Sequence, residues 1–123
     1  MKHSVKHLLK HSGTYHVRGT LWIEYNGERF FGPGRVELLE CIAETGSLNK
    51  AAKKMGMSYK KAWEMVASLN KQTKTPLVLL QSGGEKGGGS TLSPLAHELI
   101  AYHQRLRERF AAFLAKEDGF LIK

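Results

Sequence analysis

The sequence has 123 residues, of which 41% are hydrophobic and 24% charged, and this balance predicts a single folded globular domain rather than a disordered chain. The single cysteine, Cys41, excludes an intrachain disulfide and is typical of a reducing, cytoplasmic setting. No apolar run reaches the ~20 residues that a membrane span needs, and residues 1–12 lack the pattern of a signal peptide. We therefore expect no membrane association.

The charge is high and unevenly distributed. Nineteen Lys and Arg residues against eleven acidic ones give a net charge of +8. The segment from Lys50 to Lys74 contains seven lysines and one acid, Glu64, for a net charge of +6. A basic patch of this kind usually binds an acidic polymer, although RNA, membranes and acidic proteins attract such patches as well as DNA.

Residues 1–13 contain three histidines alternating with lysines. The four-residue spacing of His3, His7 and His11 would place them on one face of a helix. Because no acidic or thiol ligand lies nearby, we predict a basic flexible arm here, with no metal site and no cofactor.

Residues 16–31 predict a β-hairpin. Asn26-Gly27 is a strong signal for a two-residue turn, and residues 28–31 form the expected returning strand. Before the turn, apolar side chains alternate imperfectly with polar ones, at Val17, Leu21, Ile23 and Tyr25.

A helix is predicted from Pro33 to about Glu44, since proline suits the first turn and Gly46 suits a left-handed C-cap. Cys41 lies on the apolar face of this helix. We therefore interpret it as a buried structural thiol, and no His–Asp pair nearby supports a nucleophile.

Two further helices predict a helix-turn-helix. Ser47 is the expected N-cap of a short helix that ends at Gly56, and Ser58 is the expected N-cap of the next. The three-residue join, 56–58, has the length of the tight turn in this motif. We expect Trp63, on the second helix, to pack against the first.

A wing is predicted after these helices. The apolar run 77–80 forms one expected strand and Thr91-Leu92 the other, with the glycine-rich loop 83–90 between them and Lys86 near its tip. A nucleotide-binding P-loop is not expected, since Gly-Lys-Ser/Thr opening a helix is missing.

Ser93-Pro94 then predicts an N-cap and the first position of a long helix that ends near Glu117. Its large apolar residues are spaced 4, 3, 4, 4 and 3 apart, close to a heptad seam, and are Leu95, Leu99, Tyr102, Leu106, Phe110 and Phe113. We interpret this seam as the interface of a homodimer; the alternative is packing within the chain's own domain. His97 and His103 on this helix are expected to be exposed and lack a paired nucleophile, so no enzyme is predicted.

The N-terminal end of a recognition helix faces base edges in the major groove. Lys60 or Lys61 can donate to guanine, and Tyr59 either contacts DNA or packs against a helix. Glu64 either accepts from cytosine or moderates repulsion among the lysines. The full set of predicted DNA-binding residues is Ser47, Lys50, Lys54, Ser58, Tyr59, Lys60, Lys61, Glu64, Lys86 and Gly87.

Two stretches of the sequence resemble a known family. TGSLNKAAKKMGMSYKKAWEMVASLN, at residues 45–70, and GGEKGGGSTLSPLAHELI, at 83–100, are similar to the N-terminal DNA-binding domain of the ModE family of molybdate-responsive regulators. The resemblance implies a recognition helix, a glycine-rich wing and a homodimer on a palindromic operator. In that family molybdate binds domains that follow the DNA-binding domain, and since this chain ends at Lys123 we do not expect molybdate binding in it.

The predicted fold class is mainly α with small β elements, a winged helix-turn-helix with an N-terminal β-hairpin and a long C-terminal dimerisation helix. The predicted segments are the arm 1–13, the DNA-binding domain 14–92, and the helix and tail 93–123. The predicted function is a sequence-specific transcriptional regulator that binds double-stranded DNA through a recognition helix at 58–72. The alternative is a winged-helix module that binds a protein partner, or nucleic acid without sequence specificity.

Overall fold

The computed structural model describes residues 4–11, 15–81 and 89–122. The chain divides into two compact units: one comprises residues 22–103, and the other comprises the residues up to 21 together with those from 104 on. The predicted segments instead divided the chain after residues 13 and 92. The last helix, α4 (Pro94–Ile122), contributes residues to both units.

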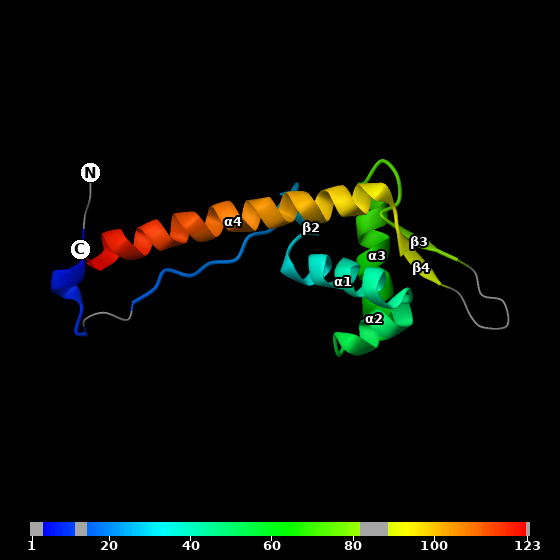
Figure 1. Ribbon diagram of the computed structural model, residues 1–123, viewed down its shortest axis with the longest axis horizontal. Coiled ribbons are helices and arrows are strands. Elements are labelled where there is room, and N and C mark those ends of the chain that lie inside the picture. Colours follow the sequence, from blue (N-terminus) through cyan, green and yellow to red (C-terminus); the bar gives the residue numbers. More distant parts are fainter. Residues whose placement is uncertain (1–3, 12–14, 82–88, 123) are drawn as a thin grey trace. The chain divides into compact units, whose positions relative to one another are not determined.

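The unit of residues 22–103 has the predicted fold class, a winged helix-turn-helix preceded by a β-hairpin. Its strands form two separate antiparallel pairs, β1 with β2 and β3 with β4. The helix α3 runs across α1, with α2 beside it, as Figure 1 shows. In chain order the elements are β1 (Ile23–Tyr25), β2 (Glu28–Phe31), α1 (Pro33–Thr45), α2 (Leu48–Lys54), α3 (Tyr59–Gln72), β3 (Val78–Leu80), β4 (Ser90–Leu92) and the start of α4.

Local capping signals begin and end the three helices as predicted. The Ser47 hydroxyl accepts a hydrogen bond from the Lys50 N–H at 3.1 Å, and the Ser58 hydroxyl accepts one from the Lys61 N–H at 3.0 Å. Gly46 follows α1 with φ of 71°, a left-handed conformation that favours glycine. The predicted turn of the helix-turn-helix therefore lies between two side-chain-capped helices.

The β1–β2 hairpin has the predicted turn but a shorter first strand. Asn26 and Gly27 both have positive φ, 50° and 80°, as a two-residue hairpin turn requires. The alternation that begins at Val17 predicted a longer strand, whereas pairing starts only at Ile23, opposite Phe31. The reason is that the chain enters α1 directly after Phe31, so residues before Ile23 have no partner strand.

The core of this unit is formed by one cluster of buried apolar side chains from the two hairpins and all four helices. Cys41 belongs to it as predicted, and burial raises the pKa of its thiol. His103 was expected to be exposed but is 2% exposed, because its ring packs edge-on against Phe31 with centroids 5.2 Å apart. The largest fully buried side chains are Phe31, Leu38, Leu39, Ile42, Leu69, Leu77, His103, Val66 and Val78.

The helix α4 begins at Pro94 as predicted, but its N-cap and its end differ from the prediction. Proline stands at its first position, but the hydroxyl of Ser93 is buried and makes no hydrogen bond to a described residue, so it is not the expected side-chain cap. The backbone oxygen of Ser93 accepts instead from the N–H groups of Ala96 and His97. The helix continues to Ile122, beyond the expected end near Glu117. No helix in the described part of the chain is both long and apolar enough to cross a membrane.

In the other unit, the N-terminal segment contacts the end of α4. Residues Lys6–Leu8 form a 3-10 helix, η1, where a flexible arm was expected. The Val5 N–H and the Ser4 hydroxyl both donate to the carbonyl oxygen of Leu121, at 3.1 and 3.2 Å. Further along, Asp118 accepts from the Val17 N–H and lies 3.0 Å from His16 Nδ1, and these two contacts lower the pKa of its carboxyl.

Candidate nucleic-acid interface

The helix α3 is held in place by one buried face and by hydrogen bonds on two opposite sides. Its buried residues are Ala62, Val66 and Leu69, spaced four and three apart as a helix packed on a core requires. The remaining surface of α3, with its lysines and aromatic residues, is therefore the part available to a ligand.

The side chain of Asn70 attaches α3 to the wing strands. Its Oδ1 accepts hydrogen bonds from the N–H groups of Leu77 and Val78 at 2.8 and 3.1 Å, and its Nδ2 donates to the carbonyl oxygen of Val78 at 3.0 Å. These three bonds fix the start of β3 against the helix. We call this side of α3 the wing flank.

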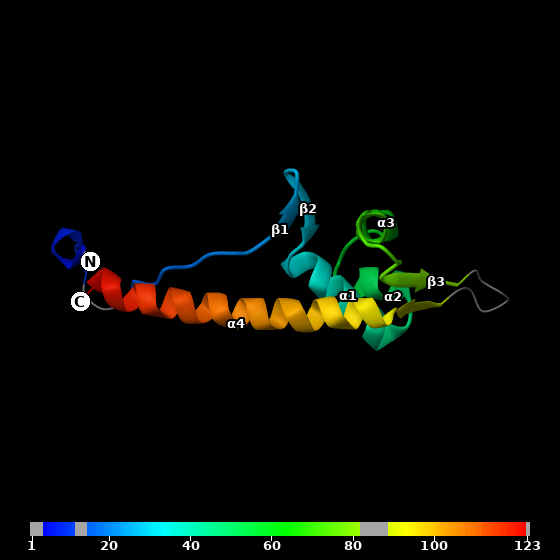
Figure 2. The same ribbon diagram turned by 90° about the horizontal axis from the view of Figure 1, so that it is seen from above.

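Gln72 attaches α3 to the other hairpin, since its Nε2 donates to the carbonyl oxygen of Arg29 in β2 at 3.2 Å. At about 100° per residue, Gln72 lies roughly 200° around the helix from Asn70. The two hairpins therefore lie at different sides of α3, as Figure 2 shows with this helix seen nearly end-on. We call the side of Gln72 the hairpin flank.

The same angle per residue assigns each exposed residue of α3 to one of the two flanks or to the surface between them. Trp63 stands seven positions before Asn70 and so lies within about 20° of the wing flank. Lys61 stands eleven positions before Gln72 and lies within about 20° of the hairpin flank. Between the flanks is the outer face of α3, defined by Lys60, Glu64 and Lys71, all of them exposed.

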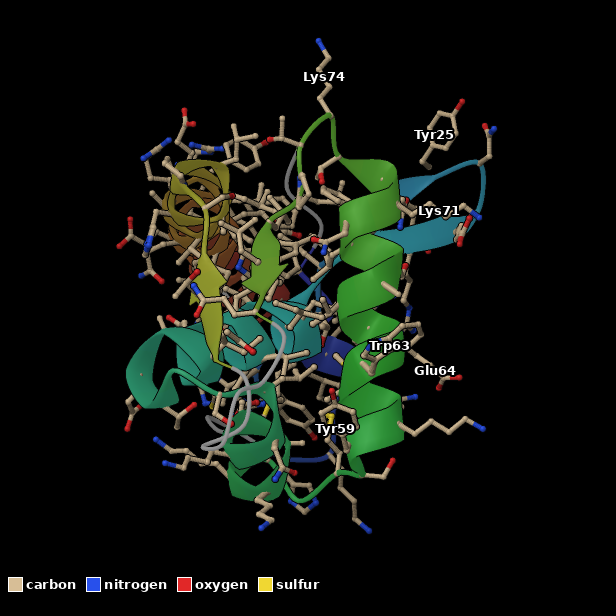
Figure 3. The ribbon with its side chains drawn as sticks, turned by 90° about the vertical axis from the view of Figure 1, so that its right-hand side faces the viewer. Tyr25, Tyr59, Trp63, Glu64, Lys71 and Lys74 are labelled. Carbon is tan, nitrogen blue, oxygen red and sulfur yellow. The ribbon has the colours of Figure 1, made fainter. Side chains whose placement is uncertain are left out.

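The two aromatic residues of α3 are on the surface. Tyr59 is 51% exposed and Trp63 48% exposed, and both side chains are labelled in Figure 3. Trp63 was expected to pack against α2; about half of its side chain is exposed, whereas Ala51 and Ala52 of α2 are buried in the core. For Tyr59, exposure of the side chain favours contact with DNA over packing against a helix.

The lysines of α2 add to this surface. Lys50 and Lys53 are exposed and take part in no ion pair among the described residues. Lys54 forms an ion pair with Glu44 of α1, with its Nζ 2.5 Å from the carboxylate oxygen, and this hydrogen bond raises the pKa of Lys54. Part of its charge is therefore neutralised within the protein.

The base of the wing is joined to the turn between α1 and α2. The hydroxyl of Ser90 accepts from the Leu48 N–H at 3.1 Å, and the Ser90 N–H donates to the Gly46 carbonyl oxygen at 2.9 Å. The strands of the wing are thereby held against the helix-turn-helix. The predicted contact residues Lys86 and Gly87 lie outside the described residues.

The predicted dimer residues on α4 fall into two groups. Leu95, Tyr102 and Phe113 are exposed, by 39%, 43% and 55%. Leu99 packs partly against the core of its own unit, and the ring of Phe110 lies against Gly19, within the other unit. Leu106 is half-buried. The described residues contain no group of three His, Cys, Asp or Glu side chains that could hold a metal ion.

The helix-turn-helix is formed by α2 and α3, α3 exposes lysines and aromatic residues, and a two-stranded wing is joined to the turn between α1 and α2. These features define a winged helix-turn-helix protein. The model of the bacterial regulatory helix-turn-helix proteins of the LysR family matches residues 34–95, and the chain belongs to this family. The family is one of regulators rather than enzymes, as the sequence predicted.

Similar proteins include molybdenum-related proteins and a transcriptional regulator. The molybdenum-pterin-binding protein MopB of Rhodobacter capsulatus is 39% identical over 85% of this chain and 38% of its own length. The molybdenum transport protein ModE of Herbaspirillum seropedicae is 39% identical over 76% of the chain and 33% of its own length. The DNA-binding transcriptional dual regulator ModE of Escherichia coli K12 is 34% identical over 72% of the chain and 34% of its own length. The resemblance to the ModE family is therefore confirmed.

The chain spans about a third of the length of these relatives. Among solved structures, ArgP from Mycobacterium tuberculosis is a distant likeness, with a TM-score of 0.49 and 16% identity over 70% of this chain and 30% of that one.

Proposed function

We propose that this chain is a sequence-specific regulator of transcription that binds double-stranded DNA in the cytoplasm, with α3 in the major groove and the wing, residues 83–90, along the backbone. Membership of a regulatory helix-turn-helix family supports the proposal. So does the relative from E. coli, which is a DNA-binding transcriptional regulator by name.

The observation that supports it most is the unpaired charge of the outer face and the hairpin flank. Lys60 and Lys71 on the outer face and Lys61 on the hairpin flank are exposed, and among the described residues none of them pairs with a carboxylate. Lysines whose charge is not neutralised within the protein are available to phosphates and base edges. The N-terminus of α3, capped by Ser58, adds backbone N–H groups on the same side.

Within this surface, Lys60 is the residue we assign to base readout. It lies on the outer face, at the N-terminal end of α3, where recognition helices reach base edges. Its ammonium group can donate to the O6 and N7 atoms of guanine. Glu64, one turn further along the same face, either accepts from cytosine or limits repulsion among the lysines.

The DNA-binding form is proposed to be a homodimer on a palindromic operator. The exposed residues Leu95, Tyr102 and Phe113 provide the apolar contacts of α4 with a second copy. Two copies related by a twofold axis would contact half-sites about one helical turn, ~34 Å, apart. Sedimentation of the protein alone and bound to DNA tests this part, because a monomer on DNA would contradict it.

The function is tested by fluorescence-anisotropy binding to fragments of the source genome, at two salt concentrations and with random DNA as competitor. We expect binding to a subset of fragments that resists the competitor and weakens steeply with salt. Lys60→Ala should reduce this selectivity, whereas Lys74→Ala, which removes an equal charge beyond the end of α3, should not. Binding that the competitor abolishes for every fragment would contradict sequence-specific recognition.

A further inference from the structure

A pocket of about 240 Å³ lies between the β1–β2 hairpin, the start of α1 and α3. This is several times the ~30 Å³ that one water occupies, so the pocket has room for a polyatomic group. Three cationic side chains line it, Arg29 of β2, Arg35 of α1 and Lys61 of α3, and no acidic residue does. Its composition predicts an anionic ligand.

The guanidinium of Arg29 is already oriented in this pocket. Its central carbon lies 3.5 Å from the centre of the Trp22 ring, in a cation–π stack. Stacking uses the flat face of a guanidinium and leaves its in-plane N–H donors for an acceptor. Because no carboxylate among the described residues pairs with Arg29, these donors are not used by an ion pair within the protein.

Arg35 holds the strand that carries Arg29. Its Nη1 donates to the carbonyl oxygens of Arg29 and Phe30, at 3.2 and 2.9 Å. Partial burial lowers the pKa of Arg35, an effect only partly opposed by Glu28 nearby. A positive charge that is partly desolvated and forms no ion pair with a described carboxylate is stabilised when an anion binds beside it.

We propose that this pocket binds a phosphate of the DNA backbone that borders the major groove occupied by α3, with Arg29 and Lys61 as donors and Trp22 and Arg35 as positioning residues. Lys61 belongs both to the recognition helix and to the pocket, so the pocket lies next to the DNA when α3 binds. The proposal rests on the proposed DNA-binding function. It assigns the β1–β2 hairpin a role on the opposite side of α3 from the wing.

The test uses a set of duplexes that contain the selected site, each with one phosphate replaced by an uncharged methylphosphonate. For the wild-type protein we expect affinity to fall about tenfold when the phosphate opposite the pocket is replaced. Arg29→Ala should lose affinity for the unmodified duplex and become insensitive to that one replacement, while it stays sensitive to the others. Arg18→Ala, which removes an equal charge from an exposed position outside this unit, should respond like the wild type.

Two further variants ensure that the test does not depend on whether Arg29→Ala folds correctly. Lys61→Ala changes an exposed residue and should show the same selective insensitivity as Arg29→Ala. Trp22→Leu keeps all three charges and should lose part of the effect at the same phosphate, because the guanidinium is no longer oriented. Thermal unfolding of each variant establishes that it is folded at the assay temperature.

The outcomes separate the proposal from the function on which it rests. A wild-type protein that binds no duplex selectively contradicts the proposed function. A wild-type protein that binds selectively, while Arg29→Ala and Lys61→Ala remain sensitive to every replacement, overturns the pocket proposal. If inorganic phosphate at matched ionic strength raises the Tm of the wild type more than that of Arg29→Ala, yet the variants keep their sensitivity on DNA, the pocket is a site for free phosphate and the proposal is wrong.

Discussion

The two flanks of α3 differ in chemistry although both are built from one helix and a two-stranded hairpin. The wing flank exposes two aromatic side chains, Tyr59 and Trp63, beside an asparagine that bonds only to backbone. The hairpin flank carries Lys61 next to a pocket lined by two arginines. Aromatic groups can distinguish bases, for example by contact with the thymine methyl, whereas cations bind phosphates of any sequence.

This difference indicates that the two sides of the recognition helix have different roles in DNA binding. We expect the outer face and the wing flank to contribute sequence preference, and the hairpin flank to contribute affinity and register.

The largest effect concerns the attachment of the two hairpins. Asn70→Ala removes three hydrogen bonds and leaves the N–H groups of Leu77 and Val78 without their acceptor, which should lower the free energy of unfolding by about 3 kcal/mol. Gln72→Ala, the matched change on the hairpin flank, removes one bond to β2 and two bonds to Ser68 within α3, all from a single amide nitrogen, and should cost about 1 kcal/mol. Urea unfolding measures both, and equal losses would show that the flanks are held equally.

A smaller effect on stability, with a large one on binding, is expected at Trp63. Since the indole is about half exposed, Trp63→Ala should change the free energy of unfolding by less than about 1 kcal/mol. Affinity for the selected site should nevertheless fall about tenfold, the scale of one base contact. Denaturant unfolding and anisotropy on the same preparation check the two values, and a variant that unfolds easily would mean that Trp63 belongs to the core.

The smallest effect concerns Lys54, whose charge is partly neutralised by Glu44. Glu44→Gln should free this lysine for DNA and tighten binding a few-fold at low salt, with a steeper dependence of log Kd on log salt concentration. Glu40→Gln removes an equal charge from an exposed position one turn earlier in α1 that forms no ion pair with a described residue. If both variants bind alike, only net charge matters and the ion pair does not restrain Lys54.

The parts that follow local rules could be predicted from the sequence. Ser47 and Ser58 cap their helices because a hydroxyl at that position reaches the N–H three residues on. Gly46 and the Asn26-Gly27 turn follow from backbone conformations that few residues adopt.

The parts of the structure that depend on tertiary packing could not be predicted from the sequence. Trp63 is about half exposed, and helical spacing alone does not determine how much of a side chain beside the buried face is covered. The burial of His103 depends on Phe31, far away in the sequence. The pocket brings together Trp22, Arg29 and Lys61, whose positions follow no periodic pattern, so no local signal predicts it.

The different roles of the two sides of α3 are tested most directly by one ratio, the affinity for the selected site divided by the affinity for random duplex. This ratio is measured for the wild type, Lys61→Ala and Trp63→Ala at two salt concentrations. We predict that Lys61→Ala weakens both affinities by the same factor and reduces the salt slope by about 0.9, so that the ratio is unchanged. Trp63→Ala should weaken only the selected site and lower the ratio. The account would be contradicted if Lys61→Ala lowered the ratio as much as Trp63→Ala, or if Trp63→Ala weakened binding to random duplex to the same extent.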